Sequence, residues 1–306
     1  MNLSMVIVTF NRLEKLKKAL DAYCQQTVAP NRLIVVDNCS SDGTGMFLDE
    51  WSRSDLPFEA EVIHASENLG GSGGFYLGEK RAMELKSDWV FVADDDAYPA
   101  RDMVEQFERY VGSHDCTGTS AICAAVHAMA GWIACSHRDY SHLVRFWRER
   151  HNSSPEDYKQ ESFEFDLLSY VGSFMNGKAL AKVGLVDPRY FIFYDDSEHS
   201  LRLQKWGKIV CVPAISIAHE EKYATKEKVA SDHVTWKDYY RFRNELHMTI
   251  RHSWLAALVY FRFYLLYFYL YKPEPAAMHE VHKAAFWDAF CGRLGKHPVY
   301  QPGWEG

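Results

Sequence analysis

The sequence predicts an α/β fold in which a mostly parallel sheet is flanked by helices. Short runs of β-branched and apolar residues alternate with amphipathic stretches through the first hundred residues, which is typical of βα units. Polar residues follow each apolar run, as expected where strands end at a binding edge. The expected strands cover 3–8, 32–36, 61–64 and 88–93, and the expected helices 12–24, 43–53 and 73–86.

The section from 119 to 220 is mixed. Four further strand candidates are the runs SAICAAVH, GWIAC, LLSYVG and IVCVPAISIAH. A helix is expected to start near Asp195 and run through DDSEHSLRLQKWG, with Leu201 and Leu203 facing inward and Gly207 ending it.

Composition changes after this section. The segment WKDYYRFRNELHMTIRHS is rich in Tyr and Arg, and WLAALVYFRFYLLYFYLY (254–271) is strongly aromatic. We therefore expect a catalytic domain at 1–225 and a helical module at 226–306. Arg262 at the centre of the aromatic run favours a helix at a membrane interface, or one packed on the protein or a dimer partner, over a membrane span.

Composition excludes some classes of function. With 34 basic and 41 acidic residues the formal charge is −7, and no basic stripe suggests a nucleic-acid partner. The seven cysteines are scattered without a CxxC pair, which favours reduced thiols in the cytoplasm. The N-terminal run LSMVIVTF lacks the features of a signal peptide.

Four strand ends carry polar residues that should meet at one rim. The first is followed by Thr9, Asn11 and Arg12, the second by Asp37 and Asn38, the third by Asn68, and the fourth by Asp94, Asp95 and Asp96. Any one of these could be an ordinary turn or helix cap. Together they predict a binding site.

The aspartate triplet crowds three carboxylates where a buried strand meets solvent. Their mutual repulsion needs compensation, and a divalent metal that also binds a diphosphate would supply it. A solvated acidic loop is the alternative. The neighbouring ENLGGSGGF (67–75) opens a helix and lacks the P-loop spacing, but its backbone could approach a phosphate or sugar.

A second acidic site lies in FIFYDDSEH (191–199). Asp195 and Asp196 could be helix caps alone. Sugar transfer with inversion, however, needs a carboxylate that takes the proton of the acceptor hydroxyl, and Asp196 is the candidate base. His219, after the last strand candidate, could complete a manganese site with the triplet.

These motifs resemble a known family. VIVTFNR, VVDNCSSDGT, ENLGGSGGF, VADDDAYP and YDDSEHSLR, in this order, are similar to the nucleotide-sugar domain of inverting family 2 glycosyltransferases with the GT-A fold. The resemblance spans about residues 3–220. Within that group, NLGGSGGF, the triple aspartate, the paired aspartates with Glu198 and a downstream histidine resemble bacterial UDP-galactofuranose galactofuranosyltransferases.

The resemblance implies a role for each matching residue. Thr9, Asn11, Arg12, Asp37, Asn38 and Asn68 would hold the uridine and ribose of a UDP-sugar, and Asp95 would also contact the donor. Asp94, Asp96 and His219 would bind Mn²⁺ or Mg²⁺ carrying the diphosphate. Asp196 would be the base, and Asp195 and Glu198 would orient a glycan or lipid-linked acceptor. Tyr194 replaces the tryptophan common at the acceptor platform.

Two alternatives remain. The segment DYYRFRNE (238–245) also resembles rhamnosyltransferases, which would use dTDP-rhamnose. A non-catalytic nucleotide-sugar-binding module is the third hypothesis. The resemblance to enzymes of cell-surface polysaccharide assembly implies a lipid-linked acceptor at the inner face of the cytoplasmic membrane. Together with the cysteines and the aromatic segment 254–271, this predicts a cytoplasmic protein that is peripheral on that membrane or forms homo-oligomers.

Overall fold

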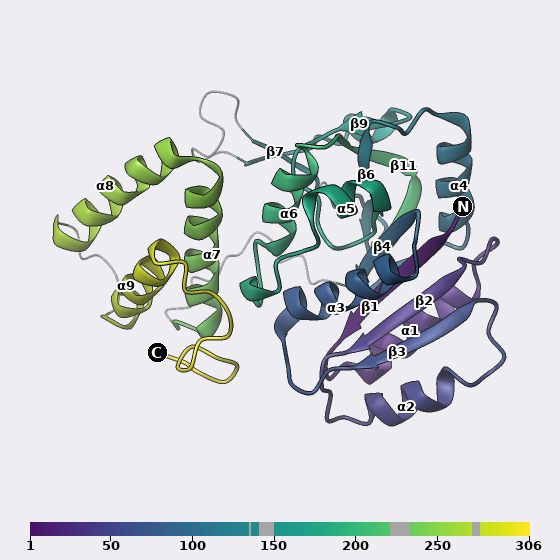
Figure 1. Cartoon of the computed structure of the whole chain (residues 1–306), viewed down its shortest axis with the longest axis horizontal. Helices are drawn as coiled ribbons and strands as arrows, with labels where there is room; N and C mark the ends of the chain where they lie inside the picture. Colours follow the sequence, from purple (N-terminus) through teal and green to yellow (C-terminus); the bar gives the residue numbers. More distant parts are fainter. Residues whose placement is uncertain (135, 141–149, 221–232, 271–275) are drawn as a thin grey trace.

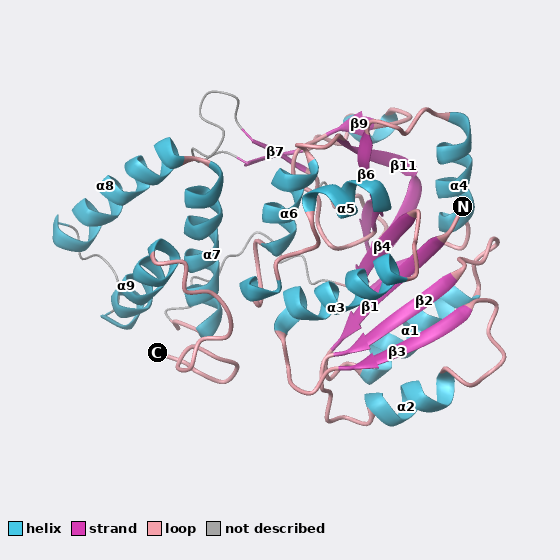
Figure 2. Ribbon diagram, viewed as in Figure 1, coloured by secondary structure: helices cyan, strands magenta, loops and turns pink. Residues whose placement is uncertain are grey.

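A computed structural model describes residues 1–134, 136–140, 150–220, 233–270 and 276–306. A central sheet with helices on both faces occupies one side of the molecule, and three C-terminal helices occupy the other (Figure 1). Helices, strands and loops are distinguished in Figure 2. The α/β class predicted from the sequence is confirmed, and so is the helical character of the C-terminal region.

The first four long strands form the parallel part of the sheet. Within the described part of the chain the sheet has nine strands, and its path runs β3-β2-β1-β4-β10-β6-β11-β5 with β9 paired to β11. The parallel strands are β1 (Leu3–Thr9), β2 (Arg32–Asp37), β3 (Glu59–His64) and β4 (Trp89–Asp94). All four lie within two residues of the predicted ranges.

The register of these strands brings the polar residues together. Thr9 lies opposite Asp37 on β2, and Val8 lies opposite Asp94 on β4. Because parallel strands end at the same edge of a sheet, Thr9, Asp37 and Asp94 share one rim, as the sequence predicts.

Alternate residues of β1 are buried on opposite faces of the sheet. Met5 and Ile7 contact the core beneath α1, α2 and α4, whereas Val6 and Val8 contact the core beneath α3 and α5. Burial on both faces explains why β1 reads as a nearly continuous apolar run. The helices are α1 (Leu13–Cys24), α2 (Thr44–Trp51), α3 (Gly70–Glu84), α4 (Met103–Ser113) and α5 (Gly177–Val183).

The second half of the sheet is mixed and carries His219 to the triplet. β10 pairs antiparallel with both β4 and β6, β6 runs parallel to β11, and β5 pairs antiparallel with β11. Since β5 directly follows Asp96, its pairing places His219 opposite Ala97. The bounds are β5 (Ala97–Pro99), β6 (Thr119–Ala128), β9 (Phe163–Glu164), β10 (Ser173–Asn176) and β11 (Lys208–His219), with a separate pair β7 (Arg138–Tyr140) and β8 (Arg150–Asn152).

Two strand predictions in this section are wrong. The described part of GWIAC is a loop that makes one bridge, from Ile133 to His127, and Cys135 lies outside the described residues. LLSYVG is also a loop. Its Leu167, Leu168 and Tyr170 are buried in the core, which accounts for the apolar character of the run. Gly172, with φ of +80°, ends the loop before β10.

The helix predicted from Asp195 is confirmed as α6 (Asp195–Leu203), and Leu201 and Leu203 are buried. Gly207 has a different role from the predicted helix stop. A Cβ there would lie 2.4 Å from the carbonyl oxygen of Gly118, so glycine permits the close backbone approach that begins β11.

The C-terminal region consists of α7 (Trp236–His252), α8 (Trp254–Leu270) and α9 (Ala276–Phe290). Tyr239 and Tyr240 of α7 are buried with Val281 and Ala285 of α9. No helix within the described ranges has both the length and the apolarity to cross a membrane. The predicted domain boundary at 225 lies outside the described residues.

Candidate functional site

A cavity of about 790 Å³ lies at the carboxyl edge of the parallel strands. Its walls include the ends of β1 and β4, the glycine segment that opens α3, the loop before α6, and the first turns of α7. Eleven predicted site residues line it: Thr9, Arg12, Asn38, Asn68, Asp94, Asp95, Asp96, Tyr194, Asp195, Asp196 and His219.

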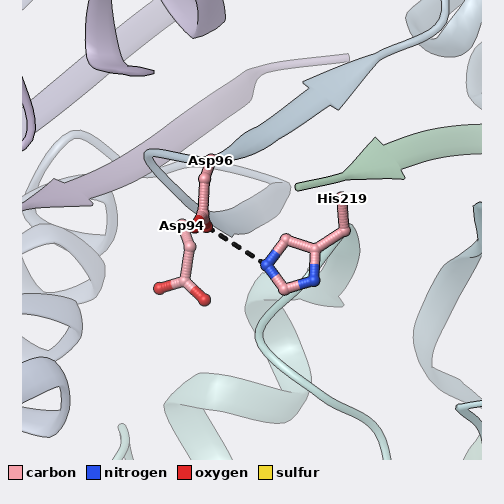
Figure 3. Close-up of side chains that lie close together, drawn as sticks. All are labelled: Asp94, Asp96 and His219. Atoms are coloured by element: carbon pink, nitrogen blue, oxygen red, sulfur yellow. Dashed lines mark hydrogen bonds and ion pairs between the residues drawn. The ribbon is translucent and has the colours of Figure 1, made fainter. Parts of the chain in front are cut away.

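Three side chains at one end of the cavity form a candidate metal site. Asp94, Asp96 and His219 each offer a ligand atom, and these atoms lie within 4.8 Å of one another. Asp94 ends β4, Asp96 lies in the turn that follows it, and His219 ends β11; their side chains lie close together (Figure 3). Two carboxylate oxygens and one imidazole nitrogen are a donor set that suits Mn²⁺. The residues therefore fit the predicted cation.

Basic side chains from the start of α1 compensate the triplet. Arg12 Nη1 lies 3.1 Å from Asp95 Oδ1 and 3.0 Å from Asp96 Oδ2, and Lys15 Nζ lies 3.0 Å from the same Asp96 oxygen. The Thr9 hydroxyl donates a 2.7 Å hydrogen bond to Asp95 Oδ2. The repulsion anticipated from the sequence is thus offset partly by the chain itself.

The three carboxylates differ in proton affinity. Burial, reinforced by the charges of Asp95 and Asp96, raises the pKa of Asp94. Burial opposes ionisation of Asp96 too, but hydrogen bonds from His219 and Lys15 and the charge of Arg12 hold its pKa well below the usual range. Asp96 Oδ1 lies 3.1 Å from His219 Nε2. A divalent cation at this place would favour the ionised form of Asp94 as well.

The glycine segment is held by two asparagines at the rim. The Asn38 side-chain amide donates to Asn68 Oδ1 at 3.2 Å and to the Gly70 carbonyl at 2.9 Å, while Asn38 Oδ1 accepts from the Leu69 N–H at 2.9 Å. Asn68 Oδ1 also accepts from the Gly70 N–H at 2.8 Å. These bonds fix the backbone of the cavity wall beside the β1 and β2 ends.

The second acidic pair begins α6. Asp196 Oδ1 accepts hydrogen bonds from the backbone N–H and hydroxyl of Ser197, and its Oδ2 lies 3.7 Å from Arg138 Nη2. Burial, followed by the charge of Asp196, raises the pKa of Asp195. The cavity thus has two acidic centres, one at the β4 end and one at the start of α6.

Three predicted site residues do not line this cavity. Asn11 is exposed, and its Oδ1 accepts from the Ser41 N–H. Asp37 is buried, and its carboxylate accepts from the Ser40 N–H and contacts His64.

Glu198 is the clearest departure. Its side chain is fully buried, accepts from Arg202 Nε at 2.9 Å and lies 2.9 Å from His252 Nε2. These contacts join α6 to α7, and Glu198 is not among the residues that line the cavity, so the acceptor role implied by the resemblance stays a prediction.

The lining residues that were not identified from the sequence as site residues include four with polar or aromatic side chains from other segments: Arg138, Trp236, Lys237 and Arg241. Trp236, Lys237 and Arg241 lie on α7, about forty residues beyond the acidic pair. The only sequence signal was the unusual Tyr- and Arg-rich composition of that helix, which we interpreted as a separate module. Their contribution depends on packing between distant segments, which spacing does not reveal.

Comparisons with known proteins show which family and fold this chain shares. The profile of the family described as "Glycosyl transferase family 2" matches residues 4–167. Galactofuranosyltransferase GlfT1 of Mycobacterium tuberculosis is 30% identical over 210 residues, which is 66% of this chain and 64% of that protein. GlfT1 of Mycolicibacterium smegmatis is 31% identical over 215 residues, covering 66% of this chain and 65% of that protein. The match therefore spans just under two thirds of these relatives' length.

Solved structures share the fold at low sequence identity. GalNAc-T7 with UDP, GalNAc and Mn2+ superimposes with a TM-score of 0.64 at 14% identity, covering 93% of this chain and 54% of that one. S. aureus TarS 1-349 in complex with UDP gives 0.57 at 14% identity, covering 88% and 72%. The predicted GT-A fold is confirmed, and the chain belongs to glycosyl transferase family 2.

Proposed function

We propose that this chain is an inverting glycosyltransferase that moves galactofuranose from UDP-galactofuranose to a hydroxyl of a glycan or lipid-linked acceptor. The observation that carries the proposal is the pair of acidic centres in one cavity. The first, Asp94, Asp96 and His219, suits a cation and a diphosphate. The second, Asp195 and Asp196, supplies a carboxylate for the acceptor side.

On the donor side, Asp94, Asp96 and His219 would hold Mn²⁺ or Mg²⁺. When bound, the cation would neutralise the diphosphate and so improve it as a leaving group. Arg12, which contacts Asp95 and Asp96, adds positive charge beside the same position. Thr9, Asn38 and Asn68 shape the wall on which the nucleoside would lie, with Asn11 and Asp37 behind it.

On the acceptor side, Asp196 would take the proton of the attacking hydroxyl. As that O–H bond breaks, the acceptor oxygen forms a bond to the anomeric carbon. The bond from that carbon to the diphosphate oxygen breaks, and its electron pair leaves with UDP. Ser197 donates to Asp196 Oδ1, and Oδ2, whose contact with Arg138 Nη2 is longer at 3.7 Å, would take the proton. Tyr194 and Asp195 would face the acceptor sugar.

Support for the donor sugar comes from similarity. Both GlfT1 relatives are described as galactofuranosyltransferases, and TarS and GalNAc-T7, which share the fold, were solved with UDP. The alternatives of dTDP-rhamnose transfer and sugar binding without catalysis lead to different outcomes in one assay.

The test is a donor panel with purified protein and Mn²⁺. UDP-galactofuranose, UDP-galactopyranose, UDP-glucose and dTDP-rhamnose are incubated separately, and release of the nucleoside diphosphate is measured with and without excess EDTA. We expect turnover with UDP-galactofuranose that EDTA abolishes. Preference for dTDP-rhamnose would overturn the donor assignment, full activity in EDTA would overturn the metal assignment, and binding without turnover would favour the non-catalytic module.

A further inference from the structure

The loop that leads into the acidic pair is strained. It joins a short 3₁₀ turn (Pro188–Tyr190) to α6, and Phe191, Phe193 and Tyr194 have φ of 68°, 66° and 64°. Side chains other than glycine rarely adopt this conformation, which costs on the order of 1–3 kcal/mol for each residue. Three such residues within four positions persist only where surrounding contacts hold them.

One side chain on α7 makes three hydrogen bonds to the backbone of this loop. The Nδ2 group of Asn244 donates to the carbonyl oxygens of Tyr190 at 2.9 Å, Ile192 at 2.8 Å and Phe193 at 3.0 Å. Asn244 is completely buried. A buried amide with three carbonyl partners is a directional anchor, and its loss would leave polar backbone groups unpaired away from water.

The neighbouring Arg243 fixes the orientation of that amide. Its Nε donates to Asn244 Oδ1 at 2.9 Å, while Nη1 donates to the Gly295 carbonyl at 2.7 Å and Nη2 to the Tyr190 carbonyl at 3.2 Å. A rotated amide would place NH₂ against the guanidinium and oxygen against three carbonyls. Only the observed orientation therefore satisfies both residues.

The anchored loop contacts both halves of the cavity. Its far end is Asp195, the first residue of α6, and Asp196 follows. Its Phe191 carbonyl accepts a 3.2 Å hydrogen bond from the Ser72 N–H in the glycine segment. Asn244 lies outside the lining, and its three hydrogen bonds to the loop connect it to the acidic pair.

We propose that Asn244, oriented by Arg243, is a positioning residue for glycosyl transfer. It holds residues 190–194 in their strained shape so that Asp195 and Asp196 face the acceptor side of the cavity. This inference rests on the proposed function. It makes α7 part of the machinery of the site, whereas the sequence suggested that the C-terminal helices form a separate module.

The test compares Asn244→Ala with a matched control, Asn176→Ala. Asn176 is also a buried asparagine; it accepts from the Lys178 N–H and donates to the Thr119 carbonyl, and it does not line the cavity. We expect Asn244→Ala to lower kcat at least tenfold while the Kd for UDP with Mn²⁺ changes less than twofold. Asn176→Ala should lose thermal stability yet keep kcat within twofold of the wild type.

A milder variant covers the case in which Asn244→Ala does not fold. Arg243→Lys keeps a buried cation but cannot supply the same Nε donor to Asn244, and we expect an intermediate fall in kcat. Unchanged kcat in a folded Asn244 or Arg243 variant would overturn the proposal. An equal loss of kcat in the Asn176 control would also overturn it, because the effect would then follow general stability.

Amide hydrogen exchange separates this inference from the proposed function. We expect faster exchange over residues 190–198 in Asn244→Ala, and unchanged exchange there in Asn176→Ala. If the wild type transfers no sugar, the proposed function fails while the exchange result still reports on the anchor. Unchanged exchange over 190–198 in Asn244→Ala would show that the anchor does not hold the loop.

Discussion

The two acidic centres should be separable by single substitutions. Asp196→Asn keeps the shape of the side chain but removes the base, so we expect transfer to fall by at least about a hundredfold, with UDP and Mn²⁺ affinity unchanged. Asp96→Asn removes a cation ligand and should weaken both affinities together with transfer. Calorimetric titration of UDP and Mn²⁺, paired with initial rates, distinguishes the two effects.

Near-normal turnover by Asp196→Asn would reassign the base. Asp195 is then the next candidate, since burial and the charge of Asp196 raise its pKa and a higher proton affinity favours proton transfer from a hydroxyl. Equal loss of Mn²⁺ affinity in the two variants would contradict the division into a metal centre and a base.

The positions of some site residues could be predicted from the sequence, and those of others could not. Residues that directly follow strands, such as Thr9 and Asp94, were predictable because parallel strands end at one rim and their register follows from the apolar runs. Glu198 was not. Its carboxylate is turned toward Arg202 and His252, and His252 lies on a helix that begins some forty residues later, so no local pattern signals the contact.

At the scale of elements, the start of α3 depends on one glycine. Gly70 has φ of +72°, and a Cβ there would lie 2.0 Å from the Phe191 carbonyl oxygen. We expect Gly70→Ala to lower stability by a few kcal/mol, through left-handed strain and displacement of the loop before α6, and to weaken UDP binding. Thermal unfolding and UDP titration measure the two effects.

Gly71→Ala is the matched control for stability. A Cβ at Gly71 meets nothing within 4 Å, and no positive φ is recorded there. Its unfolding temperature should therefore stay near that of the wild type or rise slightly, because alanine favours the helix. If Gly70→Ala were equally benign, the close contact between the glycine segment and Phe191 would not constrain the site.

A second set of contacts between elements is a buried polar chain behind the acidic pair. His199 Nε2 lies 3.0 Å from the Gly184 carbonyl and must carry a proton to donate to it. Burial lowers the pKa of His199 to about 3, so the ring is neutral and Nδ1 is left to accept from the Tyr170 hydroxyl at 2.5 Å. Tyr170 Oη is also 3.0 Å from Glu79 Oε1. Because the Tyr170 hydroxyl donates its hydrogen bond to His199, it can only accept one from Glu79. Glu79 must therefore be protonated.

This chain predicts how stability varies with pH. Burial raises the pKa of Glu79 from 4.5 to about 7, so the folded state retains a proton that the unfolded chain loses between these values. Stability should therefore fall as pH rises from about 4.5 to 7, by about 3 kcal/mol at most, and change little above that from this group. Denaturant unfolding across this range should show a shallower slope in Glu79→Gln. An unchanged slope in Glu79→Gln would mean that a group other than Glu79 binds this proton in the folded state.

The strands and helices predicted in the first ninety residues agree with the structure within a few residues, whereas two of the strand candidates between 119 and 220 are loops. β1, β2 and β4 are largely buried, β3 is a half-buried edge strand, and all four alternate with helices, so length and apolarity identify them. LLSYVG has similar apolarity but is a loop, because Leu167, Leu168 and Tyr170 fill space between elements rather than pairing along a strand. A buried loop and a buried strand can have the same apolar composition, so composition alone does not distinguish them.

At the scale of the whole molecule, charge is distributed unevenly. The formal charge of the chain is −7, yet the described residues from 233 onward carry eight basic side chains against five acidic ones, a net of +3. One face of α8 adds exposed apolar side chains at helical spacing: Leu255, Leu258 and Leu266, with Trp254 at its start and Arg262 between them. A basic region with an exposed apolar helix face suits an anionic lipid surface.

We therefore predict that the protein binds vesicles containing phosphatidylglycerol more strongly than vesicles of phosphatidylcholine alone, and that salt weakens the binding, because screening acts on the charge contribution. The double variant Leu258→Ser/Leu266→Ser should release the protein in flotation assays. Met46→Ser, which removes a 73% exposed apolar side chain from α2, is the control and should bind as the wild type does. If the double variant instead dissociated a dimer in sedimentation and left flotation unchanged, this face would be a contact between two copies of the chain. The apolar residues of α8 would then serve assembly, and access to a lipid-linked acceptor would have to come from another surface.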